Sequence, residues 1–348
     1  MTKLKLGLLP LADAAPLYVA RECGYFAGQG LDVSLSVEAS WAGLRDKLAA
    51  GMLDAAQLLA PMPLAAQLGI DRLGVPIETA LTLTRNGNAI TVSNALHAAL
   101  GAPAPTAQAT GSALKALLLR DRAEGRPLRT FAHVFPFSTH HYLLRDWLCS
   151  AGIDPDHDVR LVVVPPPLTL KALRDGRIDG YCVGAPWGYA AEHEGTGRRL
   201  LATHTIRPGC AEKVLGVSRD WAAAHPDAYL AMIAALIEAG RWLEQRGNRA
   251  AAAQMLIEAR LIAAPEECVR AALRDDANDP LSPQFIFGAG ETLSPHHDDA
   301  RWFLAQMQRW GQTRSEVDIE DTIEASYRLA THSVASARAT SVLSPRPQ

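Results

Sequence analysis

The sequence lacks the patterns of a disulfide framework, a zinc site or a membrane-spanning helix. Its cysteines are odd in number, widely spaced and free of CxxC pairs: Cys23, Cys149, Cys182, Cys210 and Cys268. This pattern favours reduced thiols packed in the interior over a disulfide framework or a zinc site. No stretch of about 20 apolar residues runs without a charge, so a membrane-spanning helix is not expected.

An excess of charge of one sign is also lacking. Lys and Arg number 34 against 37 Asp and Glu, which gives a formal net charge of -3. A protein dedicated to nucleic acid needs a basic surface to neutralise phosphates, so that class is disfavoured. The motifs GxSxG and HExxH and the P-loop are absent as well. We therefore expect a binding protein that is not an enzyme and uses no metal or cofactor.

The amino terminus, "MTKLKLGLLPLADAAPLYVA", leads directly into a strand-like run. It has no separate apolar segment followed by a small-residue cleavage site, as a secretory signal would have. If residue 1 is the natural start, we expect a cytoplasmic protein. A trimmed mature chain would remove that expectation.

Strand-like and helix-like segments alternate from the start of the chain. Residues 3–9, 31–38 and 53–59 are typical of strands, and residues 14–31 and 41–52 of helices. This order predicts parallel βαβ units and an α/β fold. A length of 348 residues favours two domains.

A weak internal repeat supports two similar halves. Residues 44–61, "LRDKLAAGMLDAAQLLAP", resemble residues 170–186, "LKALRDGRIDGYCVGAP". Each is a helix, a glycine suited to the left-handed conformation, an aspartate and a strand that ends in Ala-Pro. The shared residues are Gly51, Gly176, Asp54 and Asp179. Two α/β units in one chain predict two lobes with a ligand groove between them.

The lobes are expected to be discontinuous in sequence. We assign residues 1–90 and 205–330 to the first lobe and residues 91–204 to the second. Residues 228–260 form an Ala-rich helical region in this prediction. The tail, residues 331–348, has few large apolar residues and is predicted to be disordered.

Ligands of open α/β sheets bind at the carboxyl ends of the strands, beside helix N-termini that attract anions. Ser40 is a candidate N-cap for the helix that contains Trp41. Trp41 is either a packed aromatic or a donor whose indole N–H points at a ligand oxygen. Ser138 and Thr139 can cap a second such helix, which we expect to begin at His140.

Two histidines are adjacent there, and neighbours on a helix cannot both face one pocket. We choose His140 as the ligand residue and expect His141 to turn elsewhere; the alternative is a satisfied core histidine. Lys213, before an apolar strand, is either solvated or the counter-charge of a buried monoanion, with Glu212 a solvated neighbour. "SPHHDDARWF", from residue 294, is better interpreted as a capped helix than as a metal cluster.

Several stretches resemble the nitrate- and bicarbonate-binding proteins of the ABC-transporter solute-receptor superfamily. They occur in the family's order between about residues 5 and 315. They are residues 11–63, "STHHYLLRDWLCSAGIDP", "GRIDGYCVGAPWG", "AEKVLGVSRDW" and "ARWFLAQMQRWGQ". The resemblance implies a two-lobed clamp of the type II periplasmic-binding-protein class, with the ligand in the cleft between the lobes.

The resemblance also implies a nitrate or nitrite site. The family's binding tryptophan falls on Trp41, its amide on Asn88, its "TH" pair on Thr139 and His140, and its lysine on Lys213. Bicarbonate receptors of the family carry an acidic residue and a calcium ion near that last position, so the lysine favours nitrate or nitrite.

Three positions depart from the family pattern and leave the choice of ligand open. Asn88 is one methylene shorter than the family's glutamine, so a different approach or a bridging water is needed. Ala185 stands where glutamate or glutamine is usual, and Gln57 where histidine is usual.

Because no signal segment is apparent, the chain resembles the cytoplasmic nitrate/nitrite sensors of this family. Such sensors hold an RNA-binding antiterminator of the response-regulator type and release it when the ligand binds. We expect this function, with no direct nucleic-acid or membrane contact. The alternatives are the substrate-binding component of an ABC-type nitrate transporter and a cofactor-precursor enzyme on the same fold.

Overall fold

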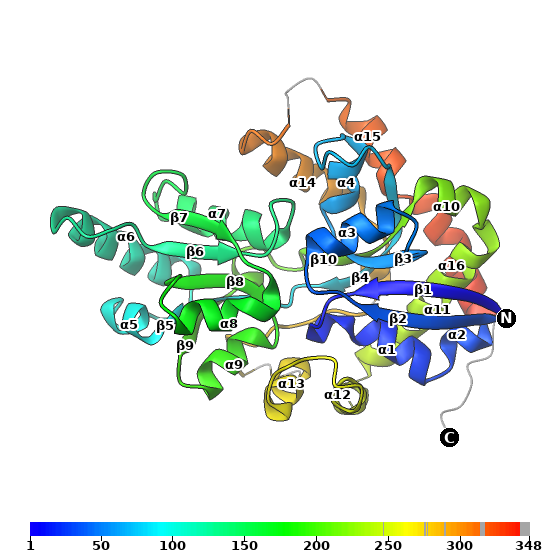
Figure 1. The fold of residues 1–348 in the computed structure, drawn as a ribbon, viewed down its shortest axis with the longest axis horizontal. Coiled ribbons are helices and arrows are strands. Elements are labelled where there is room, and N and C mark those ends of the chain that lie inside the picture. Colours follow the sequence, from blue (N-terminus) through cyan, green and yellow to red (C-terminus); the bar gives the residue numbers. More distant parts are fainter. Residues whose placement is uncertain (246, 275, 277, 289, 314–316, 342–348) are drawn as a thin grey trace. The chain divides into compact units, whose positions relative to one another are not determined.

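The computed structural model describes residues 1–245, 247–274, 276, 278–288, 290–313 and 317–341. The chain divides into two compact units. Unit 1 comprises Met1–Arg85, Ala211–Leu261 and the described part of Ile286–Gln348. Unit 2 comprises Asn86–Cys210 and Ile262–Phe285. Each unit is built around one five-stranded sheet (Figure 1).

The sheet of unit 1 has the strand order β2-β1-β3-β10-β4. Strand β1 pairs in parallel with β2 and β3, and β10 runs antiparallel to β3 and β4. The strands are β1 (Thr2–Leu8), β2 (Leu31–Val37), β3 (Ala55–Leu59), β10 (Ala211–Ser218) and β4 (Ile77–Arg85). The predicted parallel βαβ start is therefore confirmed.

Helices cover both faces of this sheet (Figure 1). One group packs together as α1 (Ala15–Glu22), α2 (Tyr25–Gly28), α11 (Pro226–Glu244), α12 (Asn248–Glu258) and α16 (Leu329–Ser341). A second group contains α3 (Trp41–Ala49), α4 (Met62–Gln67), α14 (His297–Arg309) and α15 (Ile319–Ser326). The remaining helices are η1 (Ala12–Ala14), α10 (Arg219–Ala224) and η3 (Gly290–Leu293).

The sheet of unit 2 repeats this plan with the strand order β7-β6-β8-β5-β9. Its strands are β7 (Arg160–Val163), β6 (Thr130–His133), β8 (Gly180–Gly184), β5 (Asn88–Ser93) and β9 (Gly197–Ala202). Strand β6 is parallel to β7 and β8, and β5 is antiparallel to β8 and β9. Its helices are α5 (Asn94–Ala99), α6 (Ala107–Ala123), α7 (Thr139–Ser150), α8 (Pro166–Arg174), α9 (Trp187–His193), η2 (Thr203–Thr205) and α13 (Glu266–Leu273).

The repeat that the sequence predicts is visible as the same contact in both sheets. The Asp54 carboxylate accepts a hydrogen bond from the backbone N–H of Lys5, in β1, at 2.7 Å. The Asp179 carboxylate accepts one from the backbone N–H of Thr130, in β6, at 2.8 Å. The glycines that end the two preceding helices are both left-handed, with φ of 68°. Each aspartate thus ties the start of the central strand of its sheet, β3 or β8, to the neighbouring parallel strand, β1 or β6.

Several parts of the chain differ from the sequence-based expectation. Residues 86–90, 205–210 and 262–285, expected in the first lobe, belong to unit 2, where α13 packs against α9. The expected helix over residues 14–31 is two helices, because Gly24 adopts a left-handed φ of 77° between them. The 228–260 region is helical as expected, and it comprises two helices, α11 and α12.

The tail is partly helical, so the prediction of disorder from residue 331 is wrong as far as Ser341. Helix α16 packs on α11, with Ala335 and Ala339 buried. Small side chains let the two backbones approach closely, so large apolar residues are not needed for this contact. The rest of the predicted tail, residues 342–348, lies outside the described residues.

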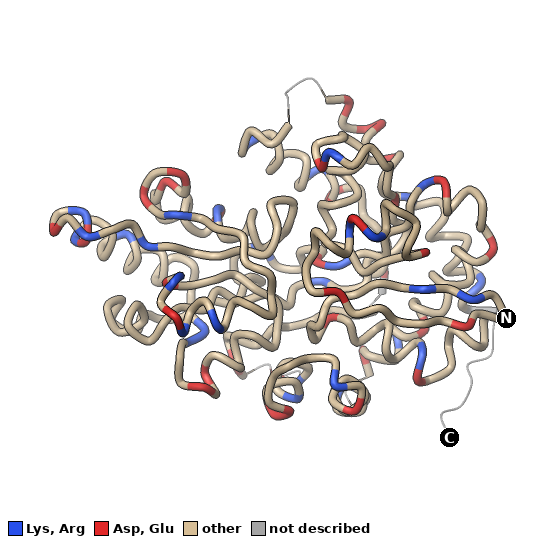
Figure 2. The backbone as a smooth tube through the Cα atoms, in the orientation of Figure 1, with Lys and Arg blue, Asp and Glu red and all other residues tan. Residues whose placement is uncertain are grey.

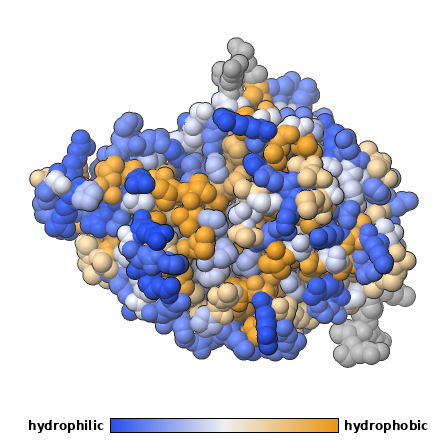
Figure 3. Space-filling view, viewed as in Figure 1, coloured by the Kyte–Doolittle hydropathy of each residue, from blue (hydrophilic) through white to orange (hydrophobic). Residues whose placement is uncertain are grey.

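The surface mixes charge and polarity. Residues of both signs are interspersed over each unit (Figure 2). Apolar and polar residues also alternate over the face drawn in Figure 3. In the described part of the chain, no helix combines the length and apolar character that crossing a membrane requires. None of the five cysteines, all of which lie in the described part of the chain, forms a disulfide, and Cys182, Cys210 and Cys268 are buried.

Candidate functional site

The predicted ligand residues of unit 1 meet at one edge of its sheet. Parallel strands β1, β2 and β3 end at this edge, and antiparallel β10 begins there. Trp41 opens α3 after β2, Asp13 lies in η1 after β1, and Lys213 pairs with Leu59 at the end of β3. This edge is where open α/β sheets bind ligands.

Lys213 is fully buried and held by two carboxylates. Its ammonium Nζ lies 2.9 Å from Asp13 Oδ2 and 2.6 Å from Glu212 Oε1. Glu212, expected to be a solvated neighbour, is 1% exposed, so that expectation is wrong. Consecutive strand residues normally point to opposite faces, but the pairing of β10 with β4 shifts register on both sides of Lys213. The contact between Glu212 and Lys213 therefore coincides with a shift in the register of β10.

This buried cluster carries more negative than positive charge. One ammonium faces two carboxylates, so the formal sum is one negative charge when all three are ionised. Burial raises the pKa of Asp13 above its ordinary value, although the Lys213 ammonium opposes the rise. Burial alone would lower the pKa of Lys213, but Asp13 and Glu212 raise it. Lys213 is therefore a cation, yet not a free counter-charge as the sequence suggested.

Gln57 holds Asp13 from the neighbouring strand β3. Its side-chain N–H donates to Asp13 Oδ1 at 2.8 Å and to the Asp13 backbone carbonyl at 3.0 Å. Gln57 is itself completely buried. Gln57, which stands where the family usually has histidine, thus still supplies a hydrogen-bond donor to the cluster.

Trp41 both packs in the interior and keeps a polar donor unused. Ser40 caps α3 as predicted, because its Oγ accepts from the backbone N–H of Gly43 at 3.1 Å. Trp41 is 1% exposed, and the Lys213 Nζ lies 5.2 Å from the centre of its ring. This is a cation–π distance. Within the described residues its indole Nε1 has no hydrogen-bond partner, which is costly for a buried donor.

The candidates of unit 2 share an equivalent edge. Strands β6 and β8 end there, and Asn88 opens β5 opposite Gly184, the last residue of β8. Helix α7 follows β6 and begins at Thr139, one residue earlier than expected. Ser138 caps it by accepting from the backbone N–H of His141 at 3.0 Å. Asn88, Thr139 and His140 are all buried.

His141, which is also on α7, forms a separate cluster with His133 of β6. Its Nδ1 lies 3.1 Å from Nε2 of His133, whose Nδ1 lies 3.1 Å from the carbonyl oxygen of Phe135. Burial lowers the pKa of His133 to about 4 and the pKa of His141 well below its ordinary value. Arg145 of α7 is paired with Asp156. Both histidines are therefore neutral near pH 7.

The structure thus brings Trp41 together with Lys213 in unit 1, and places Asn88, Thr139 and His140 along one edge in unit 2. A single anion site that uses both groups stays a prediction.

Comparison with known proteins identifies the family. Residues 1–257 match the NMT1-like family. The chain belongs to the NMT1-like family. A crystal structure of the periplasmic nitrate-binding protein NrtA from Synechocystis matches with a TM-score of 0.87 and 26% sequence identity. That match covers 99% of this chain and 91% of the NrtA chain, and it confirms the predicted α/β fold of the periplasmic-binding-protein class.

Two sequence relatives carry transport names. The chain is 35% identical over 339 residues to the bicarbonate transport ATP-binding protein CmpC of Synechococcus elongatus, a match that covers 95% of this chain and 49% of CmpC. It is 30% identical over 334 residues to the nitrate/nitrite binding protein NrtA of Nostoc, over 92% of this chain and 74% of NrtA. The chain therefore spans about half the length of CmpC.

Three further residues at these sheet edges were missed as candidate site residues. Asp13 and Glu212 surround Lys213, and Asp13 had a signal in its position directly after the first strand. Trp187 opens α9 after β8, at the same edge of unit 2 as His140. Its indole Nε1 is buried without a hydrogen-bond partner in the described structure. A tryptophan that opens a helix shortly after a strand, as Trp41 also does after β2, was the available signal.

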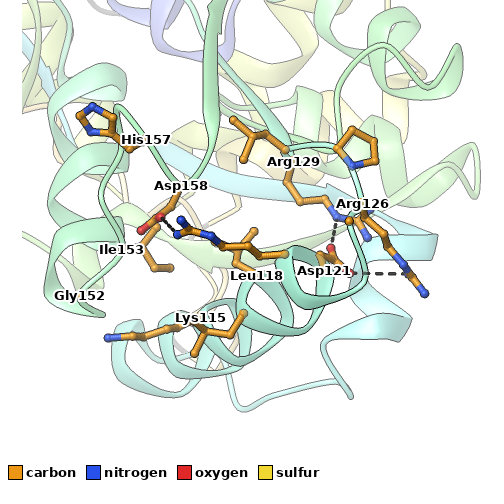
Figure 4. A pocket seen from close by; sticks show the side chains of 14 residues that line it. Lys115, Leu118, Asp121, Arg126, Arg129, Gly152, Ile153, His157 and Asp158 are labelled. Atoms are coloured by element: carbon orange, nitrogen blue, oxygen red, sulfur yellow. Dashed lines mark hydrogen bonds and ion pairs between the residues drawn. The ribbon is translucent and has the colours of Figure 1, made fainter.

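A cavity near the α6 end of unit 2 is a different feature (Figure 4). It has a volume of about 620 Å³ and lies where β6 begins, at the opposite edge from His140. Most of its charged groups are already paired. Arg129 binds Asp121 at 2.8 Å, and Arg126 lies 3.6 Å from the same carboxylate. Lys115 extends along the rim. We assign it no part in the site above.

Proposed function

We propose that this NMT1-like protein binds a small planar oxyanion, nitrate or nitrite, as the solute-binding component of a transport system. The observation that carries the proposal is the pair of buried donors at the sheet edge of unit 1. The indole N–H of Trp41 has no hydrogen-bond partner in the described structure, and the buried ammonium of Lys213 lies 5.2 Å from the centre of the Trp41 ring. A buried donor without a partner, as the Trp41 indole N–H is, indicates an acceptor that is bound there part of the time.

The donors suit the chemistry of nitrate. Nitrate offers only acceptor oxygens, so a site needs N–H and O–H groups in place of its hydration shell. Trp41 and Lys213 supply N–H donors from unit 1. Asn88, Thr139, His140 and the first turn of α7 supply further candidates from unit 2, since a helix N-terminus attracts anions. We propose that one anion uses both groups.

The names of the relatives favour transport over regulation. CmpC and NrtA are named for bicarbonate transport and for nitrate/nitrite binding, which supports the alternative that the sequence left open. The narrower hypothesis, a cytoplasmic sensor that releases an antiterminator, rests only on the family resemblance. The relatives are named for binding and transport, which also disfavours the cofactor-precursor enzyme.

Titration calorimetry of the purified chain tests the proposal. Potassium nitrate, sodium nitrite, bicarbonate and an alkanesulfonate would each be titrated under the same conditions. We expect saturable binding of nitrate or nitrite with one site per chain. Binding of bicarbonate alone would shift the ligand to the substrate of CmpC-like systems, and binding of none of the four anions would refute the proposal.

The same protein separates transport from sensing. A pull-down with an RNA-binding antiterminator of the response-regulator type, with and without nitrate, tests the narrower hypothesis. The sensor requires a complex that nitrate dissociates. A transport component requires nitrate binding with no such complex.

A further inference from the structure

The buried cluster of Asp13, Glu212 and Lys213 presents an electrostatic problem for an anion site. The three side chains are at most 2% exposed, and their formal charges sum to one negative charge. A bound nitrate would add a second negative charge to a region that water does not reach. Burying unbalanced charge is expensive, and buried groups relieve it by changing their protonation.

The donors left to an anion are few. An ammonium group has three N–H donors, and the Lys213 ammonium directs two of them at Asp13 and Glu212. In the described structure Lys213 has no third partner, so one N–H remains. Together with the indole N–H of Trp41, unit 1 offers two hydrogen bonds but no net positive charge. Unit 1 can therefore donate hydrogen bonds to an anion, but its cluster does not balance the anion's negative charge.

This inference rests on the proposed function and concerns the same ligand, nitrate or nitrite. We propose that Asp13 and Glu212 are positioning residues of the site, which fix the Lys213 ammonium, and that Asp13 takes up one proton from solvent when the anion binds. The proton adds to a carboxylate oxygen, and no other bond forms or breaks. One anion and one proton enter together, so the charge of the cluster stays at one negative charge.

The surroundings of Asp13 support a proton-accepting role. The groups that face it are Lys213 and Glu212 of β10 and Gln57 of β3, and of these only the first two carry charge. Burial already raises the pKa of Asp13. An approaching anion disfavours the carboxylate further and raises this pKa again. The bound form then holds more protons than the free form, so anion affinity must fall as pH rises.

Calorimetry in two buffers with different protonation heats counts the protons. Nitrate would be titrated between pH 6 and pH 9 into the wild-type chain. We expect an uptake approaching one proton per nitrate and, where uptake is complete, a Kd that rises about tenfold per pH unit. Asp13→Asn and Glu212→Gln each remove one negative charge, so we expect the uptake and the steep pH dependence to disappear in both.

Glu78→Gln is the matched control. Glu78 is another buried carboxylate of unit 1 whose pKa burial raises, but it pairs with Val217 at the far end of β10. Its replacement should leave the proton count unchanged.

The outcomes separate this inference from the proposed function. Nitrate binding without proton uptake in the wild type overturns the inference and leaves the oxyanion site intact. This measurement uses the wild-type chain, so it does not depend on whether a variant folds. Uptake that persists in both amide variants also overturns it, because the proton then binds elsewhere. Absence of nitrate and nitrite binding at every pH refutes the function and the inference together.

Discussion

Replacing Lys213 by methionine tests the role of the ammonium most sharply. Methionine keeps most of the volume of the lysine stem but removes its charge. Asp13 and Glu212 would then remain buried without the ammonium that lies 2.9 Å and 2.6 Å from them. The variant should lose nitrate binding, and it should also lose stability.

The size of the stability loss follows from the geometry. At the effective dielectric constant of about 20 that suits such sites, each attraction is worth about 4 kcal/mol at a 4 Å separation of charges. The lysine no longer has to be desolvated, which offsets part of this. Breaking a buried ion pair by removing one partner costs about 3–5 kcal/mol, and we expect Lys213→Met to lower the free energy of unfolding by this amount at pH 7.

The loss should depend on pH with a definite sign. Without the ammonium, nothing opposes the burial that raises the pKa of Asp13 in the folded chain above its unfolded value. The folded variant then binds more protons than the unfolded chain, so its stability is greatest at low pH and is lost as pH rises. Urea unfolding at pH 5 and pH 7 measures this difference.

A triple variant that adds Asp13→Asn and Glu212→Gln serves as the control. It removes all three charges, so stability should largely return while nitrate binding stays absent. Wild-type stability and wild-type nitrate affinity in Lys213→Met at pH 7 would refute both the buried cluster and its place in the site.

Three further predictions concern other parts of the molecule. Trp41→Phe removes an indole N–H that has no partner in the described structure, so calorimetry should show an affinity about 10- to 100-fold weaker while urea unfolding changes by less than about 1 kcal/mol; an unchanged affinity would remove Trp41 from the site. Gly87 has a φ of 102° and an added Cβ would overlap the Phe285 ring, so Gly87→Ala should cost about 2–5 kcal/mol in urea unfolding; a neutral effect would contradict this packing. Burial lowers the pKa of His133 to about 4, below its unfolded value of about 6.5, so its contribution of about 3 kcal/mol is present above pH 6.5 and is lost as pH falls towards 4. Urea midpoints measured across that range should fall in the wild type and fall less in His133→Gln, and equal slopes would contradict it.

Features encoded by local sequence were predictable. The caps Ser40 and Ser138 and the left-handed Gly51 and Gly176 follow from residue types with strong local preferences. The repeat predicted two similar α/β units, and the two sheets do share one strand order. The start of α7 was misplaced by only one residue.

Features that depend on distant pairing were not predictable from pattern. Asp13 and Lys213 are 200 positions apart, and they meet only because β10 inserts between β3 and β4. Glu212 reaches the same ammonium at a register shift that its sequence does not mark. The sequence therefore indicated a cation near a ligand and could not indicate that two carboxylates already hold it.

A crystal structure of the chain grown with nitrate tests the central claim most directly. The account predicts one nitrate within hydrogen-bond distance of Trp41 Nε1 and Lys213 Nζ, with at least one further contact from Asn88, Thr139 or His140. Nitrate bound only elsewhere, for example beside Lys115 in the cavity of Figure 4, with the Trp41 and Lys213 donors unoccupied, would contradict it.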